Sequence, residues 1–466
     1  MSAIYIQRNP QIKLGLRRSL VGKAAVYFLA GLLLGASSAQ AQPGPMPFGD
    51  PSCHGLMTAD LDALRGLMDD AVNGSLTTGC AILLAHEGEI VFREARGDLV
   101  MDDLYAIASV TKSLSATGVA MAEDQGYLTL NQPLSDFVPA FADVRVGDPV
   151  SGPPPIRPPT VLDTVSNQSG ITPNYDQEEK DFCESLAASV DITATNALAL
   201  DPGNWLYSSK AFGVGDRCVE VATGLPFTRF IQEQLFDELG MSNTFFDEPW
   251  FNPNPDPDPP PCFPYDPDVI GKFIMGGGGL WSTMDDLAIF ADMHRRDGEY
   301  HGVRVMSVAA AQGMRDFQIA STDTPWLIGS DYGMGWWMER EVSGEYQTIT
   351  GAGSFGDQIG VDLDIDVTGV AFTQSTSYAD MESWLRDVQL TARGFSWVAD
   401  ACSAGDMNCD DVLDVNDVEP FVQALIDPAA YDLAYPDCDA NRIDVNEDTS
   451  NDALDIQAFV TALLGS

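Results

Sequence analysis

The sequence contains few basic residues. Its 466 residues include 24 Lys and Arg against 69 Asp and Glu, and the formal net charge at pH 7 is −45. No cluster of Lys or Arg follows residue 23. A polyanion would be repelled, so we do not expect nucleic-acid binding. The acidity fits a soluble protein, a salty medium or carboxylates that bind calcium.

Histidine is also scarce, with four residues at positions 54, 86, 294 and 301. They are scattered, and no CxxC or Cys/His spacing accompanies them, so a zinc hydrolase is not expected. A Ser-His-Asp triad is disfavoured as well. The chain has no Gly-x-Ser-x-Gly elbow, and no His follows residue 301.

Long hydrophobic runs are absent. The apolar stretch from Ala24 to Leu34 is shorter than the ~20 residues of a membrane span, which disfavours an uncleaved anchor. Five basic residues precede or adjoin this stretch, and Ala39-Gln-Ala41 offers a cleavage site. We therefore expect residues 1–41 to be a signal peptide and the protein to be secreted, periplasmic or at the cell surface.

Eight cysteines remain after such cleavage, and an exported chain can pair them as disulfides. Sequence alone does not give the pairing. Cys409 and Cys438 occupy matching places in the C-terminal tail, and we expect them to pair with each other.

The central motif is Ser109-Val110-Thr111-Lys112, which follows a short expected strand from Tyr105 and opens an apolar helix. A Ser and a Lys three residues apart at a helix start lie on one face. If burial lowers the pKa of the Lys, its amine can take the Ser proton or hold the alkoxide. In other proteins the same spacing also occurs as a solvated pair.

The passage from Tyr105 to Pro139 resembles the serine β-lactamase and penicillin-binding-protein group. More narrowly, it resembles the branch of class C β-lactamases, D-alanyl-D-alanine carboxypeptidases and esterases. The resemblance implies that Tyr207, in Tyr207-Ser208-Ser209, matches the branch's Tyr-x-Asn element and shuttles the proton to the leaving group. Ser209 replaces the usual Asn at a substrate-binding position.

The third element of the family is Lys-Thr-Gly or His-x-Gly on the strand beside the site. Its best match here is Gly351-Ala352-Gly353, which has no basic residue. The cation normally holds a substrate carboxylate, so its absence favours neutral esters or amides over penicillins and peptidoglycan stems. We expect Gly351 and Gly353 to contact substrate. Backbone N–H groups of Ser109 and of the strand around residue 353 would form the oxyanion hole.

Two further stretches resemble the same branch. Residues 160–171 would pack the rim of the site. The glycine run 276–279 lacks the Gly-Lys-Ser/Thr of a phosphate cradle, and Ser282 to Asp286 instead predict a helix cap.

The expected fold is α/β (α+β), with one antiparallel sheet flanked by helices as in the β-lactamase/transpeptidase group. It would span residues 55–398, after a linker at 42–54. Helices are expected at 59–72, 226–239 and 382–393. Strands are expected at 79–86 and 89–93 and, late in the chain, at 332–338, 346–350, 358–364 and 368–373.

The tail, residues 399–466, is different in composition and contains two similar loops. Each loop places oxygens at positions 1, 3, 5 and 12, as a calcium loop does, and each precedes an apolar helix, at 418–425 and 456–464. The duplication and the final Asp resemble a dockerin type I module, which implies a cohesin or cell-surface scaffold as partner. The expected Ca²⁺ ligands are Asp406, Asn408, Asp410, Asp417, Asp444, Asn446, Asp448 and Asp455.

These features predict a secreted serine hydrolase that forms an acyl-Ser109 intermediate, needs no cofactor for catalysis, and binds Ca²⁺ in its tail. Within the fold, a β-lactamase, a D-alanyl-D-alanine carboxypeptidase or D-amino-acid amidase, and an esterase remain alternatives. A catalytically inactive protein of the same fold, used for binding or scaffolding, is the alternative of another class.

Overall fold

The computed structural model describes most of the chain after residue 42. The expected signal peptide, the proline-rich loop at 252–267, Cys183, Cys262, Cys402, Asp410 and Asp448 lie outside the described residues. The described residues are 43–173, 175, 185–246, 274–316, 318–320, 331–340, 346–373, 378–398, 404–409, 413–435, 438, 440–446 and 450–465.

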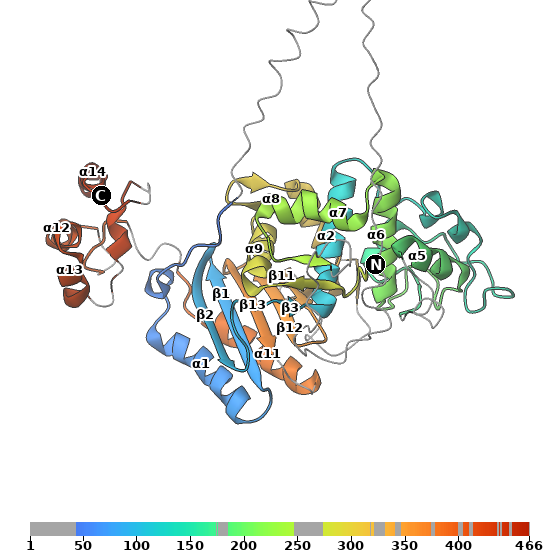
Figure 1. Ribbon diagram of the computed structural model, residues 1–466, viewed down its shortest axis with the longest axis horizontal. Coiled ribbons are helices and arrows are strands. Elements are labelled where there is room, and N and C mark those ends of the chain that lie inside the picture. Colours follow the sequence, from blue (N-terminus) through green and yellow to red (C-terminus); the bar gives the residue numbers. More distant parts are fainter. Residues whose placement is uncertain are drawn as a thin grey trace, which may run out of the picture. The chain divides into compact units, whose positions relative to one another are not determined.

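One antiparallel sheet of eight strands organises the larger part of the chain (Figure 1). The strand order is β2-β1-β13-β12-β11-β10-β9-β8, so the first hairpin pairs with the last strand. The strands are β1 (Gly79–His86), β2 (Glu89–Gly97), β8 (Ile319–Ala320), β9 (Asp331–Tyr332), β10 (Trp337–Arg340), β11 (Tyr346–Ala352), β12 (Asp357–Asp362) and β13 (Val367–Thr373).

Helices cover both faces of this sheet, and β1 shows why. Its side chains alternate between two cores, with Ile82 on one face and Ala81 and Leu83 on the other. Helices α1 (Thr58–Asn73) and α11 (Tyr378–Arg393) pack on the Ile82 face (Figure 1). Helices α2 (Thr111–Asp124), α6 (Ser209–Thr223) and α9 (Met284–Arg295) contribute to the other core. The predicted antiparallel sheet flanked by helices is confirmed.

The remaining elements form the helical middle of the chain and several short connections. Among the described residues, a three-stranded sheet has the order β3-β5-β4, and β6 pairs with β7 in a two-stranded sheet. These elements are η1 (Pro51–His54), β3 (Tyr105–Ala106), η2 (Ala108–Val110), η3 (Leu134–Asp136), η4 (Pro139–Asp143), α3 (Val161–Val165), α5 (Leu186–Thr195), α7 (Phe227–Ile231), the π-helical turn η5 (Gln232–Phe236), α8 (Asp237–Leu239), β4 (Phe245–Phe246), β5 (Leu280–Ser282), β6 (Glu299–Tyr300), β7 (Val303–Arg304) and α10 (Val308–Met314).

The expected continuous strand at 332–338 is wrong, because the chain turns between β9 and β10. Gly335 has φ +74°, and the Gly333 N–H donates to the carbonyl of Trp336. β9 and β10 therefore pair antiparallel as separate strands, with Trp337 opposite Tyr332. A glycine pair inside an apolar segment was the available signal for this turn.

Residues 43–54 of the segment expected as a linker are held against the sheet. Phe48 forms a parallel bridge with Ile90, and the Gly49 N–H donates to the Ile90 carbonyl at 3.0 Å. Met46 and His54 are buried. Proline and glycine content indicates irregular backbone but carries no information about such distant pairing.

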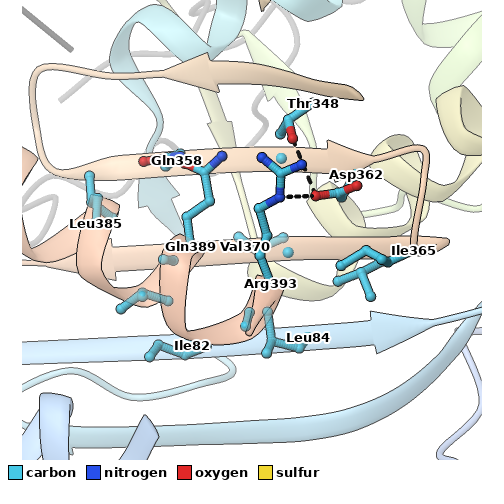
Figure 2. Close-up of a pocket in the computed structure, with 16 residues that line it drawn as sticks. Ile82, Leu84, Thr348, Gln358, Asp362, Ile365, Val370, Leu385, Gln389 and Arg393 are labelled. Atoms are coloured by element: carbon cyan, nitrogen blue, oxygen red, sulfur yellow. Dashed lines mark hydrogen bonds and ion pairs between the residues drawn. The ribbon is translucent and has the colours of Figure 1, made fainter. Parts of the chain in front are cut away.

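A pocket lies between the sheet and α11 (Figure 2). Leu385 and Gln389 reach it from α11, and Ile82 comes from β1. At one side, Arg393 Nε pairs with Asp362 Oδ2 at 2.9 Å. Because α11 covers the face opposite α2, this pocket is separate from Ser109 and Lys112, neither of which lines it.

The described residues of the tail fold around a small core of their own. Phe421 stacks on Phe459 with ring centroids 3.9 Å apart, and Tyr431 is fully buried. The expected Cys409–Cys438 disulfide is present. Both expected helices are confirmed, and the tail elements are η6 (Val415–Asp417), α12 (Val418–Ile426), α13 (Pro428–Ala434), η7 (Ala440–Ile443) and α14 (Asp455–Gly465).

Among the described residues, every helix is too short or too polar to cross a membrane.

Candidate active site

Ser109 sits in the single turn η2, between strand β3 and helix α2. The Ile107 N–H donates to the Leu280 carbonyl at 3.0 Å, which fixes the end of β3 against β5. Ala108 then has φ +38°, an uncommon backbone angle for a residue with a side chain. Strain next to a half-buried serine is typical of a functional turn that the surrounding structure holds in place.

Lys112 lies one turn further on and is almost completely buried, with 1% of its surface exposed. Its Nζ is 3.0 Å from Ser109 Oγ, as the Ser-x-x-Lys spacing predicts. Burial lowers the pKa of Lys112 to about 7. Near neutral pH, much of the amine is therefore uncharged and has a lone pair that can accept a proton.

Two other oxygens surround the same amine. Nζ is 2.6 Å from the Gly277 carbonyl oxygen and 2.9 Å from Ser209 Oγ. The carbonyl can only accept a hydrogen bond, and Ser209 Oγ can also accept one. When the amine is neutral, these two oxygens can take both N–H groups, which directs the lone pair at the Ser109 hydroxyl.

Ser209 was expected to contact substrate in place of the family's Asn. Its hydroxyl contacts Lys112, and it is the first residue of α6; contact with substrate stays a prediction. In this structure Ser209 therefore helps to orient the lysine.

Tyr207 lies beside the lysine amine. Nζ is 4.6 Å from the centroid of the Tyr207 ring. The ring is half-buried and stacks on Trp337 with centroids 5.9 Å apart and an interplanar angle of 18°. The three residues expected to be catalytic, Ser109, Lys112 and Tyr207, are thus brought to one place although Tyr207 is distant in sequence.

Asn167 positions the segment that carries Tyr207. The Leu206 N–H donates to the Asn167 carbonyl, and the Ser208 N–H donates to Asn167 Oδ1, both at 2.9 Å. Asn167 has φ +57°, which Asn tolerates better than most residues. The resemblance of 160–171 to the family predicts a segment at the rim of the site, but nothing in the sequence singles out Asn167, since a lone Asn before Gln-Ser-Gly has no distinctive spacing.

The glycine run 276–279 packs against the start of α6. A Cβ at Gly277 would lie 2.5 Å from the Ser209 Cα, so only glycine allows this approach. The close contact brings the Gly277 carbonyl to Lys112. The helix cap expected after the run is present, because Thr283 Oγ1 accepts from the Asp286 N–H at the start of α9.

Gly351 lies near the end of β11 and Gly353 directly follows it; this strand contacts the turn that carries Ser109. A Cβ at Gly351 would be 2.7 Å from Ser113 Oγ, and one at Gly353 would be 1.9 Å from an oxygen of Asp357. The absence of a basic residue therefore has a steric explanation. As packed here, α2 and β12 leave no room for a side chain at either position.

The backbone N–H of Gly353 donates to the Asp357 carbonyl at 2.8 Å and points toward β12. Along an antiparallel strand, N–H groups alternate in direction. The N–H of Ala352, the last residue of β11, therefore points to the opposite side, away from β12.

Three aromatic residues pack together next to Tyr207. Trp205, Tyr332 and Trp337 are buried, and the Trp205 ring is 5.6 Å from Trp337 and 5.1 Å from Tyr332. Burial raises the pKa of Tyr332 well above its usual range. With Tyr207, these rings form an aromatic wall of neutral groups, and the adjacent pair Trp336-Trp337 was its only local sequence signal.

In the tail, the last Asp of each expected calcium loop organises its loop. Asp417 Oδ1 accepts from the N–H groups of Met407 (2.7 Å) and Asn408 (3.0 Å). Asp455 Oδ1 accepts from the Asn446 N–H at 3.2 Å. Asp406, Asp417 and Asp455 are fully buried, and Arg442 Nη1 lies 3.2 Å from Asp406 Oδ2.

Comparison with known proteins agrees with this geometry. Residues 64–393 match the Beta-lactamase family, from α1 to the end of α11. The chain belongs to the beta-lactamase family. It is a serine hydrolase of that family, and the match ends before the acidic tail.

Several curated proteins are similar in sequence to this chain, and their names differ in function. Penicillin-binding protein 4 of Amycolatopsis lactamdurans is 29% identical over 247 residues, which cover 50% of this chain and 62% of that protein. Lovastatin esterase of Penicillium rubens is 26% identical over 243 residues, covering 46% and 60%. Esterase EstB of Burkholderia gladioli is 28% identical over 221 residues, covering 42% and 54%.

Solved structures show the same fold. EstCE1, a hydrolase with promiscuous acyltransferase activity, aligns with a TM-score of 0.60 at 18% identity and covers 72% of this chain and 99% of its own. A family VIII carboxylesterase aligns with a TM-score of 0.57 at 17% identity, covering 73% and 98%.

Proposed function

We propose that the protein hydrolyses neutral esters, or amides, through an acyl-Ser109 intermediate. The observation that carries the proposal is the contact of 3.0 Å between Ser109 Oγ and a buried lysine amine whose pKa is lowered to about 7. A nucleophilic serine needs a base within hydrogen-bond reach, and this amine is in reach and partly deprotonated.

Acylation would begin when neutral Lys112 takes the Ser109 proton as Oγ attacks the substrate carbonyl. The N–H of Ser109, together with the N–H of Ala352, would stabilise the oxyanion, because the N–H of Gly353 is already bonded within the turn. The protonated amine, or the hydroxyl of Tyr207, whose ring lies beside the amine, would protonate the leaving group. Water would then attack the acyl-enzyme with Lys112 again accepting a proton.

The preference for a neutral substrate rests on β11 and on the aromatic wall. Position 351 is where the family's cation would bind a substrate carboxylate, and here α2 closes that space against Gly351. Tyr207 and Trp337 present apolar ring surface near the nucleophile. An apolar acyl group is therefore favoured over an anionic one, as the esterases among the named relatives would suggest.

For the tail, we propose a dockerin-like calcium-binding module that docks on a cohesin or another cell-surface scaffold. The two loops end in buried carboxylates, Asp417 and Asp455, around which backbone groups already converge. Carboxylate and amide oxygens suit Ca²⁺, which would neutralise these buried charges. We also propose that residues 1–41 are a signal peptide that directs export, so that such an assembly would form outside the cytoplasm.

The test is intact-mass spectrometry after exposure to a fluorophosphonate, p-nitrophenyl butyrate and a penicillin, with Ser109→Ala as the matched variant. Fluorophosphonate or butyryl adducts that disappear in Ser109→Ala, without a penicilloyl adduct, would support the esterase-type function. A durable penicilloyl adduct would favour peptidoglycan or β-lactam substrates. Absence of every adduct would refute hydrolysis and favour a binding protein of this fold.

A further inference from the structure

Two buried histidines face each other at the turn between β1 and β2. His54 ends η1 and His86 ends β1, and they are 5% and 3% exposed. Their Nδ1 atoms are 2.8 Å apart, and the rings meet edge to face at 88°. Ser109 chemistry uses neither residue. Two imidazole nitrogens that point at one spot are a common beginning of a metal site.

A carboxylate completes a set of three donors. Glu87 follows His86 in the turn, and one of its oxygens, with one nitrogen of each histidine, lies in a group whose members are all within 4.8 Å of one another. Glu87 has φ +54°, and its N–H donates to the Asp366 carbonyl at 3.0 Å. The backbone that carries this carboxylate is therefore held in an uncommon conformation beside the two imidazoles.

A second carboxylate orients His54 from outside the group. Glu89 Oε2 is 3.1 Å from His54 Nε2, so the carboxylate favours a proton on Nε2 and a lone pair on Nδ1. Metal-binding histidines usually have such an outer carboxylate on the second ring nitrogen. A Cβ at Gly49 would lie 2.6 Å from His54 Nε2 and 2.5 Å from Glu89 Oε2, so the chain covers this pair with glycine.

The opposite side of the cluster is packed as well. The His86 ring lies against Trp397 with centroids 5.0 Å apart, and the Val398 N–H donates to the His54 carbonyl at 3.1 Å. Both imidazoles are thus held between the segment before α1 and the residues after α11. Fixed orientation lowers the entropy lost when a ligand binds.

We propose that His54, His86 and Glu87 bind one divalent transition-metal ion of the zinc type, with Glu89 as the residue that orients His54. Two neutral imidazoles and a carboxylate are donors that Zn²⁺ favours, and a water would complete a tetrahedral shell. Two nitrogens bound to one such ion lie about 3.3 Å apart. The Nδ1 atoms need to separate by only a few tenths of an ångström from the observed hydrogen-bond distance.

The ion would have a structural role. It would join the segment at 43–54 to the β1–β2 turn and add to their existing contacts, which are the Phe48–Ile90 bridge, backbone hydrogen bonds and the side-chain contacts of His54 with His86 and Glu89. This site is independent of the proposed hydrolysis, since none of its ligands contacts Ser109 or Lys112 in the part of the chain that the structure describes.

The experiment uses the full chain with excess Ca²⁺ to saturate the acidic tail. Zn²⁺ retained after dialysis is measured by elemental analysis, and Co²⁺ is titrated to detect the visible absorption of a tetrahedral nitrogen-ligated site. The variants are His86→Asn, Glu87→Gln and Glu89→Gln. His301→Gln, at the turn between β6 and β7 outside the cluster, is the matched histidine control.

We expect one Zn²⁺ per chain in the wild type and in His301→Gln, loss of the cobalt spectrum in His86→Asn, and an affinity at least ~10-fold weaker in Glu89→Gln. Glu87 is only half-buried, so Glu87→Gln tests the site even if His86→Asn fails to fold. Retention of no zinc by the wild type, or equal affinity in Glu87→Gln and His301→Gln, would overturn the proposal.

Discussion

The side chain of Lys112 is enclosed by the described residues around it. It is 1% exposed, and its three oxygen neighbours come from η2, from the start of α6 and from the glycine run. Removal from water disfavours the ammonium form, and this lowers the pKa of Lys112 to about 7. The residue can therefore act as a base near neutral pH.

The hydrolytic activity should increase with pH as Lys112 loses its proton. Below about pH 7, Lys112 is protonated and cannot accept the Ser109 proton, so kcat/KM for p-nitrophenyl butyrate should rise with pH and level off above it. Lys112→Arg, which keeps the charge but cannot deprotonate, should lose about 10²–10⁴-fold in kcat/KM. Stopped-flow hydrolysis with Ser109→Ala as background measures both. A profile that is flat between pH 5 and 9 would contradict this role of Lys112.

A substitution at Tyr207 can separate the role of its hydroxyl group from the role of its aromatic ring. Tyr207→Phe should keep the stacking on Trp337 and the ring beside Lys112 Nζ while it removes the hydroxyl. If the hydroxyl transfers a proton to the leaving group, kcat should fall about 10²-fold with little change in thermal stability. Steady-state kinetics and thermal unfolding of the same preparation give both values. Unchanged kcat would assign proton transfer to Lys112 alone.

At the scale of elements, the site is built where a short strand, three helices and a glycine run meet beside the main sheet. The alternation of β1 side chains separates the α1/α11 core from the core that contains α2 and α6. Ser109 thus belongs to the α2 side, and the pocket under α11 belongs to the other (Figure 2). The glycine run completes the lysine environment through backbone alone.

Two neighbouring glycines test this packing. Gly277→Ala would place a methyl group 2.5 Å from the Ser209 Cα, so the glycine run should move away from α6. The carbonyl of residue 277 should then lose its hydrogen bond from Lys112. We expect a loss of about 1–3 kcal/mol in unfolding free energy and a large fall in kcat/KM. Gly278→Ala is the matched control, because its new methyl would meet no atom closer than 3.9 Å. Equal effects of the two substitutions would show that the close contact is unimportant.

At the scale of the whole molecule, two folded parts with separate cores follow one another along the chain. The family match ends at 393, and the tail has its own aromatic core and disulfide. Their stabilities should respond to different agents, because the buried carboxylates that would bind calcium lie in the tail.

Asp417→Ala should selectively weaken the tail. The Asp417 carboxylate accepts N–H groups of Met407, Asn408 and Asp414, so its removal leaves donors unsatisfied at about 1–3 kcal/mol. In the full chain, Ca²⁺ should protect the tail from proteolysis in the wild type and in Asp432→Ala, an exposed control on α13, but not in Asp417→Ala. Butyrate hydrolysis should be the same in all three. Equal protection of Asp417→Ala would contradict its place in a calcium loop.

The sequence predicted those parts of the site that depend on local spacing. Ser109 and Lys112 lie together because three residues make nearly one helical turn, and the helices at 418–425 and 456–464 follow from apolar periodicity. Asn167, Trp337 and the His54–His86 pair escaped prediction because their contacts join distant segments. The contacts of residues 43–54 with the sheet were not predicted for the same reason: the composition of this segment gives no sign of pairing with Ile90.

The close approach of Gly351 to Ser113 restricts how this enzyme could evolve specificity for anionic substrates. Ser113 Oγ donates to the Gly335 carbonyl at 2.8 Å, so it cannot simply turn aside for a lysine at 351. A single Gly351→Lys change should be harmful, and Ser113→Gly alone should bring no new specificity. Carboxylate recognition would then require both changes together, a sign-epistatic barrier that directed evolution by single steps would rarely cross.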